Sequence, residues 1–172
     1  DEEGNLLLNG EKTGKKLYKH SASVGMYYGD VSDEEKAVVQ EITITPKEYR
    51  NYVTGLYAPA GEIIKIEISQ EDLSSIGGLV VSVGQISHVN KNNNIWKAKD
   101  NFCRMPNLGN LFTITKETTY VGNYLGGPIY LKSNKIGVEY TVKISGAVKY
   151  TYYIHGLTTK EEFEEMKSYS AP

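Results

Sequence analysis

Apolar and polar residues alternate along several stretches of this chain, and this pattern limits the possible folds more than any other feature. A period of two residues is typical of β-strands that bury one face and expose the other. The pattern predicts strands at 42–45, 64–68, 79–84, 112–115, 138–145 and 150–155. A turn over 54–62 is expected before the strand at 64–68. Gly126 and Gly127 are expected to allow a close backbone approach or a bulge before a further strand.

Strands with one solvated face favour antiparallel sheets, because parallel sheets are usually covered on both faces. Several such strands need a second layer over their apolar face, and two packed sheets are the simplest arrangement. We therefore predict an all-β fold, an antiparallel two-sheet β-sandwich of jelly-roll-like form, over 28–157. Residues 1–27 are expected to be irregular or to form an edge hairpin, and 158–172 to form a short helix and a junction to a missing downstream domain.

Helix signals are few and short. The clearest lies at 158–166, where Thr158 or Thr159 can cap the first turn and several glutamates follow. Acidic side chains near a helix N-terminus interact favourably with the helix dipole. Shorter helical segments are expected after Ser32, where Ser-Asp-Glu-Glu resembles a capping box, and at 70–73.

Composition excludes some classes of partner. The chain has 172 residues, a formal net charge of −2 and 40% hydrophobic residues, which is ordinary for a globular domain. A nucleic-acid partner would normally require a clustered basic face, and a membrane span would require about 20 consecutive apolar residues. The sequence contains neither feature, so we expect no nucleic-acid partner and no membrane span.

The histidines and the cysteine do not form a catalytic motif. A zinc hydrolase usually places two histidines and a glutamate on one helical turn as His-Glu-x-x-His. His20, His88 and His155 are each isolated, and a site built from all three is the alternative to three unrelated histidines. The single cysteine, Cys103, lies beside Arg104, and we favour inert packing over a reactive thiol. We therefore predict no catalytic residue and no metal ligand within this chain.

Two loops carry residues that suit ligand binding. Trp96 follows an asparagine-rich loop that includes Asn93 and Asn94, and a second loop contains Asn123 and Tyr124. An aromatic face beside amide groups suits a sugar ring or a peptide, because it combines stacking with directional hydrogen bonds. The alternative for Trp96 is a place at the end of the core, where large aromatic residues commonly lie.

Short motifs along the chain follow the order and spacing of a known family. The most specific motif contains Thr54, Gly55, Leu56, Tyr57, Pro59 and Gly61. Further motifs are Tyr28-Gly29-Asp30-Val31, Val83 to His88, Arg104 with Pro106, Gly126-Gly127-Pro128-Ile129-Tyr130, and Gly156 to Thr159 with Phe163. Together they resemble the N-terminal, non-catalytic β-sandwich portion of the M60-like (enhancin-type) zinc metallopeptidases, over about 28–166. The chain departs from the family pattern where Leu125 separates Tyr124 from the glycines, and where the Tyr28-Gly29-Asp30-Val31 motif lacks a proline.

This resemblance implies an accessory region that supports or positions glycoprotein or mucin substrate for a catalytic half outside this chain. The family's zinc-binding motif lies further downstream, so the resemblance implies zinc for the full-length protein and no cofactor here. It also implies three further expectations: a downstream catalytic domain of the same polypeptide as partner, a host glycoprotein or glycan as ligand, and an extracellular or cell-surface location. The alternatives are a free-standing carbohydrate- or protein-binding module and a surface antigen domain without catalysis.

Overall fold

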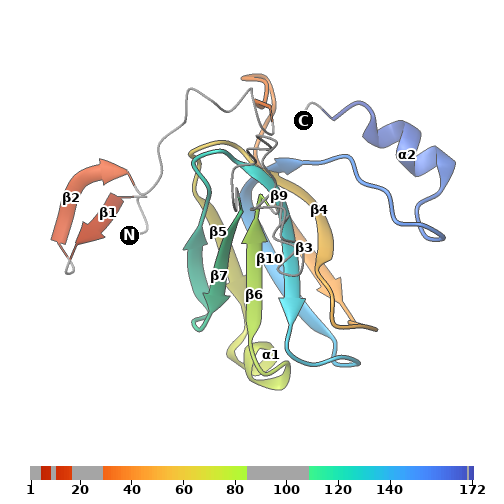
Figure 1. The fold of residues 1–172 in the computed structure, drawn as a ribbon, viewed down its shortest axis with the longest axis horizontal. Helices are drawn as coiled ribbons and strands as arrows, with labels where there is room; N and C mark the ends of the chain where they lie inside the picture. Colours follow the sequence, from red (N-terminus) through yellow and green to blue (C-terminus); the bar gives the residue numbers. More distant parts are fainter. Residues whose placement is uncertain (1–4, 9–10, 17–28, 85–108, 170) are drawn as a thin grey trace, which may run out of the picture.

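The computed structural model describes residues 5–8, 11–16, 29–84, 109–169 and 171–172. β1 (Asn5–Leu8) and β2 (Glu11–Lys16) pair antiparallel in a two-stranded sheet of their own. All other strands in the described ranges belong to one eight-stranded sheet, which runs in the order β7-β6-β9-β4-β10-β5-β8 with β3 paired to β10 (Figure 1). These strands are β3 (Val38–Ile44), β4 (Tyr52–Ala58), β5 (Ile64–Ile68), β6 (Leu79–Val83), β7 (Asn110–Ile114), β8 (Thr118–Val121), β9 (Gly127–Ser133) and β10 (Tyr140–Lys149).

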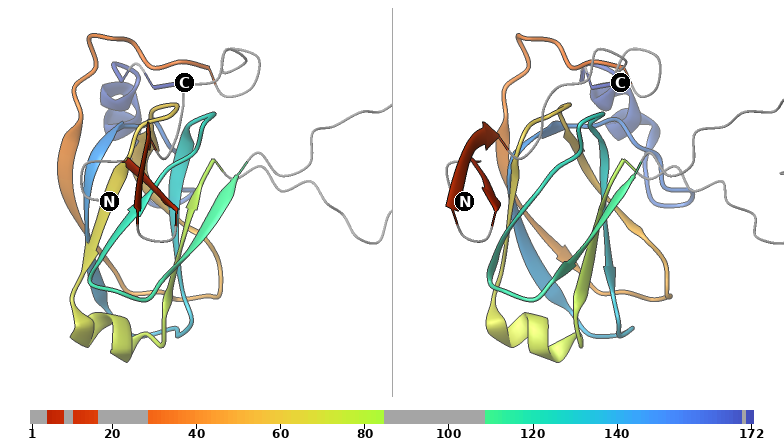
Figure 2. Two further views of the ribbon diagram at one scale, coloured as in Figure 1. Left: turned by 90° about the vertical axis from the view of Figure 1, so that its left-hand side faces the viewer. Right: turned by 60° about the vertical axis from the view of Figure 1, so that its left-hand side comes forward.

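The long strand β10 joins the two layers of the sandwich. Its first part pairs with β3 and β5, and its last two residues, Val148 and Lys149, pair with β4 instead. Between these parts the register with β3 shifts at Gly146, which has a φ of 91°. A Cβ at this position would lie 2.8 Å from the Ile63 carbonyl oxygen, so only glycine fits the crossover. The two predicted sheets are therefore one folded sheet whose halves face each other (Figure 2).

The core lies between the two halves and is filled by the alternating apolar residues. In β5 the burial alternates strictly, with Ile64, Ile66 and Ile68 at most 4% exposed. The facing half contributes buried side chains from β4, β6, β7 and β9, among them Leu56, Leu79, Val81, Val83, Ile114, Ile129 and Leu131. On the outer face, Glu67 pairs with Lys65 at 2.8 Å and with Lys143 at 3.7 Å. The predicted all-β antiparallel fold is confirmed.

Some expected boundaries were wrong. The expected turn over 54–62 is strand up to Ala58, and the turn itself is closed by a hydrogen bond from Glu62 N to Pro59 O of 3.1 Å. The expected strand at 150–155 is absent because the chain leaves the sheet after Lys149 and enters a turn that ends at Thr158. Sequence patterning also missed the short strand β8.

Two short helices lie at opposite ends of the sandwich (Figure 1). α1 (Gln70–Ser75) confirms the helical segment expected at 70–73, and α2 (Lys160–Met166) confirms the C-terminal helix. Thr159 caps α2 through a reciprocal capping box with Glu162. The expected helix after Ser32 is instead a single turn, in which Glu35 N donates to Ser32 O at 3.0 Å. No helix within the described ranges has the length and apolar content needed to cross a membrane.

Tyr140 yields a prediction about alkaline stability. Its side chain is 1% exposed, and its hydroxyl has no hydrogen-bond partner among the residues that the structure describes. Burial, and secondarily the nearby Tyr52, raise the pKa of Tyr140 to about 12. The pKa of Tyr140 in the folded state is thus higher than its value of about 10 in the unfolded chain. Below pH 10 the hydroxyl is neutral in both states, and the fold keeps its full stability. As the pH rises from 10 towards 12, the hydroxyl ionises more readily in the unfolded chain, and the fold loses stability.

Tyr140→Phe should therefore keep or raise the stability at neutral pH, by up to about 1 kcal/mol, since no hydrogen bond is lost and a buried polar group is removed. The loss of stability between neutral pH and pH 11 should also be smaller than in the wild type. Urea denaturation at both pH values measures the two effects. A variant less stable than the wild type at neutral pH would show that the hydroxyl has a partner in solution.

Candidate functional site

One end of the sandwich, called here the upper end, is built from the β4–β5 turn (59–63) and the β8–β9 turn (122–126). The C-terminal end of β10 and α2 lie at the same end, whereas α1 and the β3–β4 loop lie at the other (Figure 1). The residues of the most specific sequence motif and the Gly126-Gly127 pair fall at or just below the upper end.

Asn123 is buried in the upper end, where it links three segments. It is 0% exposed, its Nδ2 donates to Val83 O at 3.1 Å, and its Oδ1 accepts from Leu125 N at 2.9 Å. Its carbonyl oxygen accepts hydrogen bonds from Gly61 N at 3.0 Å and Gly126 N at 2.9 Å. The buried side chain of Asn123 therefore holds the upper end together, and its predicted ligand contact stays a prediction.

Gly127 allows a close backbone approach between the start of β9 and the end of its neighbouring strand β6. A Cβ on Gly127 would lie 2.3 Å from the Cα of Gly84, and a Cβ on Gly126 would lie 2.7 Å from Ala58 O. Both glycines have positive φ, at 130° and 69°. Gly84 N also donates to Pro128 O at 2.9 Å. The expected close backbone approach is confirmed.

Thr54 and Gly55 form a bulge in β4. The β4–β9 register shifts between Val53 and Tyr57, and the Thr54 hydroxyl occupies the gap in the ladder. It donates to Ile129 O at 2.7 Å and accepts from Leu56 N at 3.2 Å. Gly55 has a φ of 72°, and its carbonyl accepts from Tyr150 N at 2.9 Å. The motif interpreted from the sequence as a turn is therefore a strand bulge that holds the segment after β10.

The remaining motif residues also serve the architecture. Leu56 is fully buried in the main core. Tyr57 is 1% exposed, its ring centre lies 5.7 Å from that of Tyr150, and its hydroxyl donates to Gly29 O at 3.5 Å. Pro59 and Gly61 form the β4–β5 turn. Five predicted residues lie outside the described part of the chain: Asn93, Asn94, Trp96, Arg104 and Pro106.

Tyr124 is the predicted ligand-binding residue that the structure places on the surface, with 44% of it exposed. It lies on the β8–β9 turn, beside the two points where the chain enters and leaves the segment 85–108. At the entry, Val83 O accepts from Asn123 Nδ2. At the exit, Asn110 Nδ2 donates to Gly122 O at 3.2 Å. Tyr124 and both anchors of the segment that contains Trp96 thus share the upper end.

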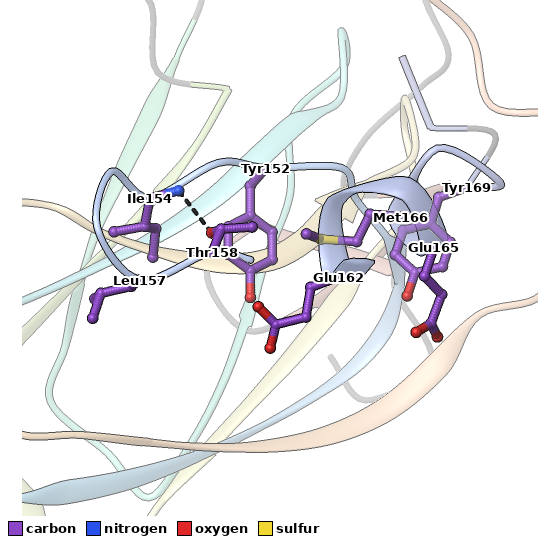
Figure 3. A pocket seen from close by; sticks show the side chains of 8 residues that line it. All are labelled: Tyr152, Ile154, Leu157, Thr158, Glu162, Glu165, Met166 and Tyr169. Atoms are coloured by element: carbon purple, nitrogen blue, oxygen red, sulfur yellow. Dashed lines mark hydrogen bonds between the residues drawn. The ribbon is translucent and has the colours of Figure 1, made fainter. Parts of the chain in front are cut away.

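Two surface hollows, which the sequence analysis did not predict, lie near this end. One, of about 350 Å³, is bordered by the β4–β5 turn and by Asp30, Asp33, Glu35 and Glu62. The other, of about 300 Å³, lies against α2 (Figure 3), and we call it the α2 hollow. It is lined by Tyr152, Ile154, Leu157, Thr158, Glu162, Glu165, Met166 and Tyr169. A sequence signal existed for it, because Glu162, Glu165, Met166 and Tyr169 are spaced as one helix face.

The residues that the structure describes do not fit a zinc site. Within these ranges no group of three His, Cys, Asp or Glu side chains is arranged to hold a metal ion. His155 is exposed on the turn before α2, while His20 and His88 fall in ranges that are not described.

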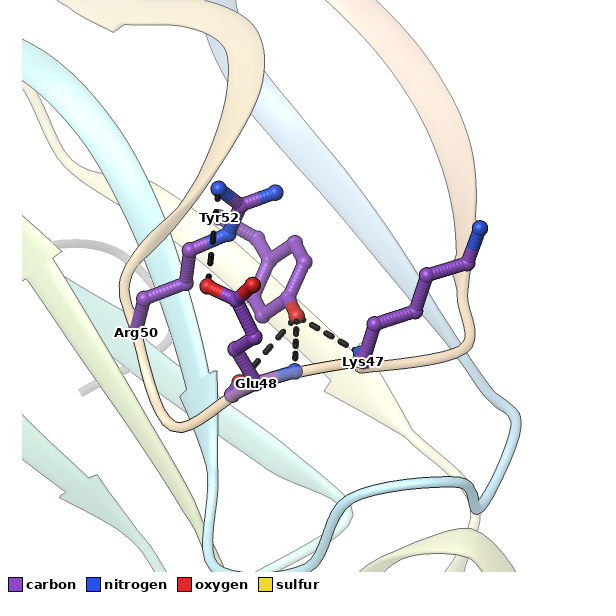
Figure 4. A network of polar contacts seen from close by, with 4 residues as sticks. All are labelled: Lys47, Glu48, Arg50 and Tyr52. Carbon is purple, nitrogen blue, oxygen red and sulfur yellow. Dashed lines mark hydrogen bonds and ion pairs between the residues drawn. The ribbon is translucent and has the colours of Figure 1, made fainter.

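At the opposite end, Tyr52 organises the β3–β4 loop (Figure 4). Its hydroxyl accepts from Lys47 N at 2.8 Å and from Glu48 N at 3.0 Å, and it donates to Glu48 O at 3.1 Å. The Arg50 guanidinium lies 5.1 Å from the centre of the Tyr52 ring. This loop is a locally stabilised turn, and its exposed Tyr49 offers a control position far from the upper end.

The fold and the upper end together define an antiparallel β-sandwich domain. Its motif residues, such as Thr54, Gly55 and Gly127, form a strand bulge and allow a close approach of two backbones. The family described as the N-terminal domain of M60-like peptidases matches residues 33–145, and the chain belongs to this family. The resemblance inferred from the motifs is therefore confirmed.

Individual relatives agree with this assignment. The chain is 31% identical over 121 residues to TRPM8 channel-associated factor 3 of Rattus norvegicus, a match that covers 68% of this chain and 12% of that protein. It is also similar in structure to the IMPa metallopeptidase of Pseudomonas aeruginosa, with a TM-score of 0.61 and 17% identity over 86% of this chain and 17% of IMPa. IMPa in complex with an O-glycopeptide gives a TM-score of 0.56 and 16% identity over 88% of this chain and 17% of IMPa. The chain therefore spans a small part of each relative, and the likeness to IMPa concerns the fold.

Proposed function

We propose that this domain supports or positions a glycoprotein substrate for a catalytic domain of the same polypeptide. The observation that carries the proposal is the convergence at the upper end. There Tyr124 is exposed beside the two anchors of the segment that contains Asn93, Asn94 and Trp96. Membership of an N-terminal peptidase-domain family supports a catalytic partner in the same protein. IMPa, which shares the fold, has been seen in complex with an O-glycopeptide, and this supports a glycosylated ligand.

In this proposal the described residues supply shape and contact surface, and the bond-breaking groups belong to the catalytic domain. Zinc, if the full-length protein uses it, would be held there. A glycoprotein ligand also suits an extracellular or cell-surface location, which we include in the proposal.

The test compares binding of an O-glycopeptide with binding of the unglycosylated peptide of the same sequence. Trp96→Ala and Tyr124→Ala should each weaken glycopeptide binding by about tenfold, because each removes an aromatic surface that can stack on a sugar. Tyr49→Ala is the matched control, since Tyr49 is an exposed tyrosine at the opposite end. Equal binding of the two peptides, or equal loss in Tyr49→Ala, would contradict the proposal.

A second candidate function is a protein-binding module without catalysis. It is favoured by the relative whose name describes association with a channel. The two candidates differ in what the full-length coding sequence must contain. A His-Glu-x-x-His motif after this domain supports the peptidase, and its absence favours the protein-binding module.

A further inference from the structure

We propose that the α2 hollow is a binding site for an arginine side chain presented by another polypeptide. The hollow is formed by the segment that follows β10 and by α2, and its lining begins at Tyr152. It therefore lies outside residues 33–145, which match the peptidase family. The proposal is independent of the glycoprotein function proposed above.

The walls of the hollow are fixed by local hydrogen bonds. In the turn before α2, Thr158 N donates to Ile154 O at 2.9 Å, and Ile154 N donates to Thr158 Oγ1 at 2.9 Å. Tyr152 rests on the β4 bulge, because a Cβ on Gly55 would lie 2.7 Å from its ring. Directly after this turn, Thr159 caps α2. A site with fixed walls loses little conformational entropy on binding.

One face of α2 supplies both negative charge and an apolar floor. Glu162 and Glu165 line the hollow near Tyr152 and Tyr169 respectively, and Met166, which is 7% exposed, lies between them (Figure 3). The Glu162 carboxylate accepts from Thr159 N at 2.8 Å. Among the described residues, neither carboxylate forms an ion pair with a lysine or arginine, whereas Glu164 on another face is paired with Lys167 at 2.7 Å. Among its described lining residues, the hollow therefore presents two carboxylates and no cation.

Tyr152 and Tyr169 add aromatic surfaces beside these carboxylates. Lys149 Nζ lies 5.2 Å from the centre of the Tyr169 ring, although Lys149 does not line the hollow. The Tyr169 ring thus already interacts with the ammonium group of Lys149. An arginine side chain combines an aliphatic stem with a planar cation that stacks on aromatic rings and binds carboxylates through paired hydrogen bonds.

The size of the hollow favours a single side chain over a longer ligand. Its volume of about 300 Å³ is at the lower end of the range for small-molecule sites. The exposed side of the hollow includes Leu157, which is 72% exposed and available to the polypeptide on either side of the bound residue. An anionic sugar or an acidic peptide would be repelled by both carboxylates.

The experiment titrates the chain, labelled with ¹³C at its methionine methyl groups, with the capped peptide Gly-Gly-Arg-Gly-Gly. The Met166 methyl signal reports on the floor of the hollow. It should shift with a Kd in about the millimolar range, and binding should weaken as the salt concentration rises. The same peptide with citrulline in place of arginine is neutral and nearly the same size, and it should bind at least about tenfold more weakly.

Glu162→Gln with Glu165→Gln should weaken binding of the arginine peptide by at least about tenfold without unfolding α2, because glutamine also completes a capping box. The control is Glu161→Gln with Glu164→Gln, which changes the net charge equally on the same helix but away from the hollow. This control should bind like the wild type. The proposal is overturned by an absent Met166 shift, by equal binding of the citrulline peptide, or by equal weakening in the two double variants.

Discussion

Ile66→Asp should unfold this domain at ambient temperature. Ile66 is 0% exposed in the centre of β5, opposite the equally buried Ile144 of β10 on one side and Thr119 of β8 on the other. An aspartate there would place a carboxylate among the apolar side chains of the core. Such a change costs about 5 kcal/mol or more, which is comparable to the whole stability of a typical domain.

Lys65→Asp is the matched control, since it introduces the same side chain at the neighbouring position of the same strand. The Lys65 side chain is 38% exposed on the outer face, where it pairs with Glu67. Loss of this surface pair should cost only about 1 kcal/mol. Circular dichroism and thermal denaturation of both variants measure the contrast. If Lys65→Asp were the more damaging change, the assignment of the two sheet faces would be wrong.

Gly127→Ala should be the most damaging conservative substitution among the glycines of the upper end. The new methyl group would lie 2.3 Å from the Cα and 2.9 Å from the N of Gly84, which are backbone atoms and cannot rotate away. The residue would also have to keep a φ of 130°, which alanine strongly disfavours. Steric overlap and backbone strain together should cost about 3 kcal/mol or more.

Gly137→Ala is the control that has backbone strain without steric overlap. Gly137 also has a positive φ, of 76°, but a Cβ there would meet no atom within 4 Å. Its substitution should cost only about 1–2 kcal/mol, the strain of the left-handed conformation. Urea denaturation of both variants measures the excess cost at Gly127, which comes from the contact with Gly84 and from the larger φ. Equal losses in the two variants would mean that the close approach contributes nothing.

Much of the sandwich could be predicted because alternation is a local property of the sequence. Ile64, Ile66 and Ile68 follow a strict two-residue period, and they are buried on one face as this period requires. The segment 150–155 has the same pattern but forms no strand. Tyr150, Tyr152 and Ile154 alternate just as well, but the chain turns away from the sheet after Lys149. Periodicity identifies residues that suit a strand and does not identify whether a partner strand is within reach.

The candidate site was less predictable, because burial decides what a polar loop residue does. Asn123 and Tyr124 are adjacent in the sequence and were expected to act alike. The structure buries Asn123 completely and leaves Tyr124 44% exposed. The α2 hollow was missed for a related reason. Its helix face contains ordinary glutamates, and the hollow forms where the turn at Ile154–Thr158 and the ring of Tyr152 lie against this face.

The sequence by itself determined the antiparallel β-class, the capped C-terminal helix and the family, because alternation, capping residues and motif order are encoded over a few neighbouring residues. Only the tertiary structure decided that the two layers are one sheet folded at Gly146, and that Gly84 and Gly127 meet. These contacts join residues far apart in the chain. Their energies depend on distances between backbones, which no local pattern of side chains records.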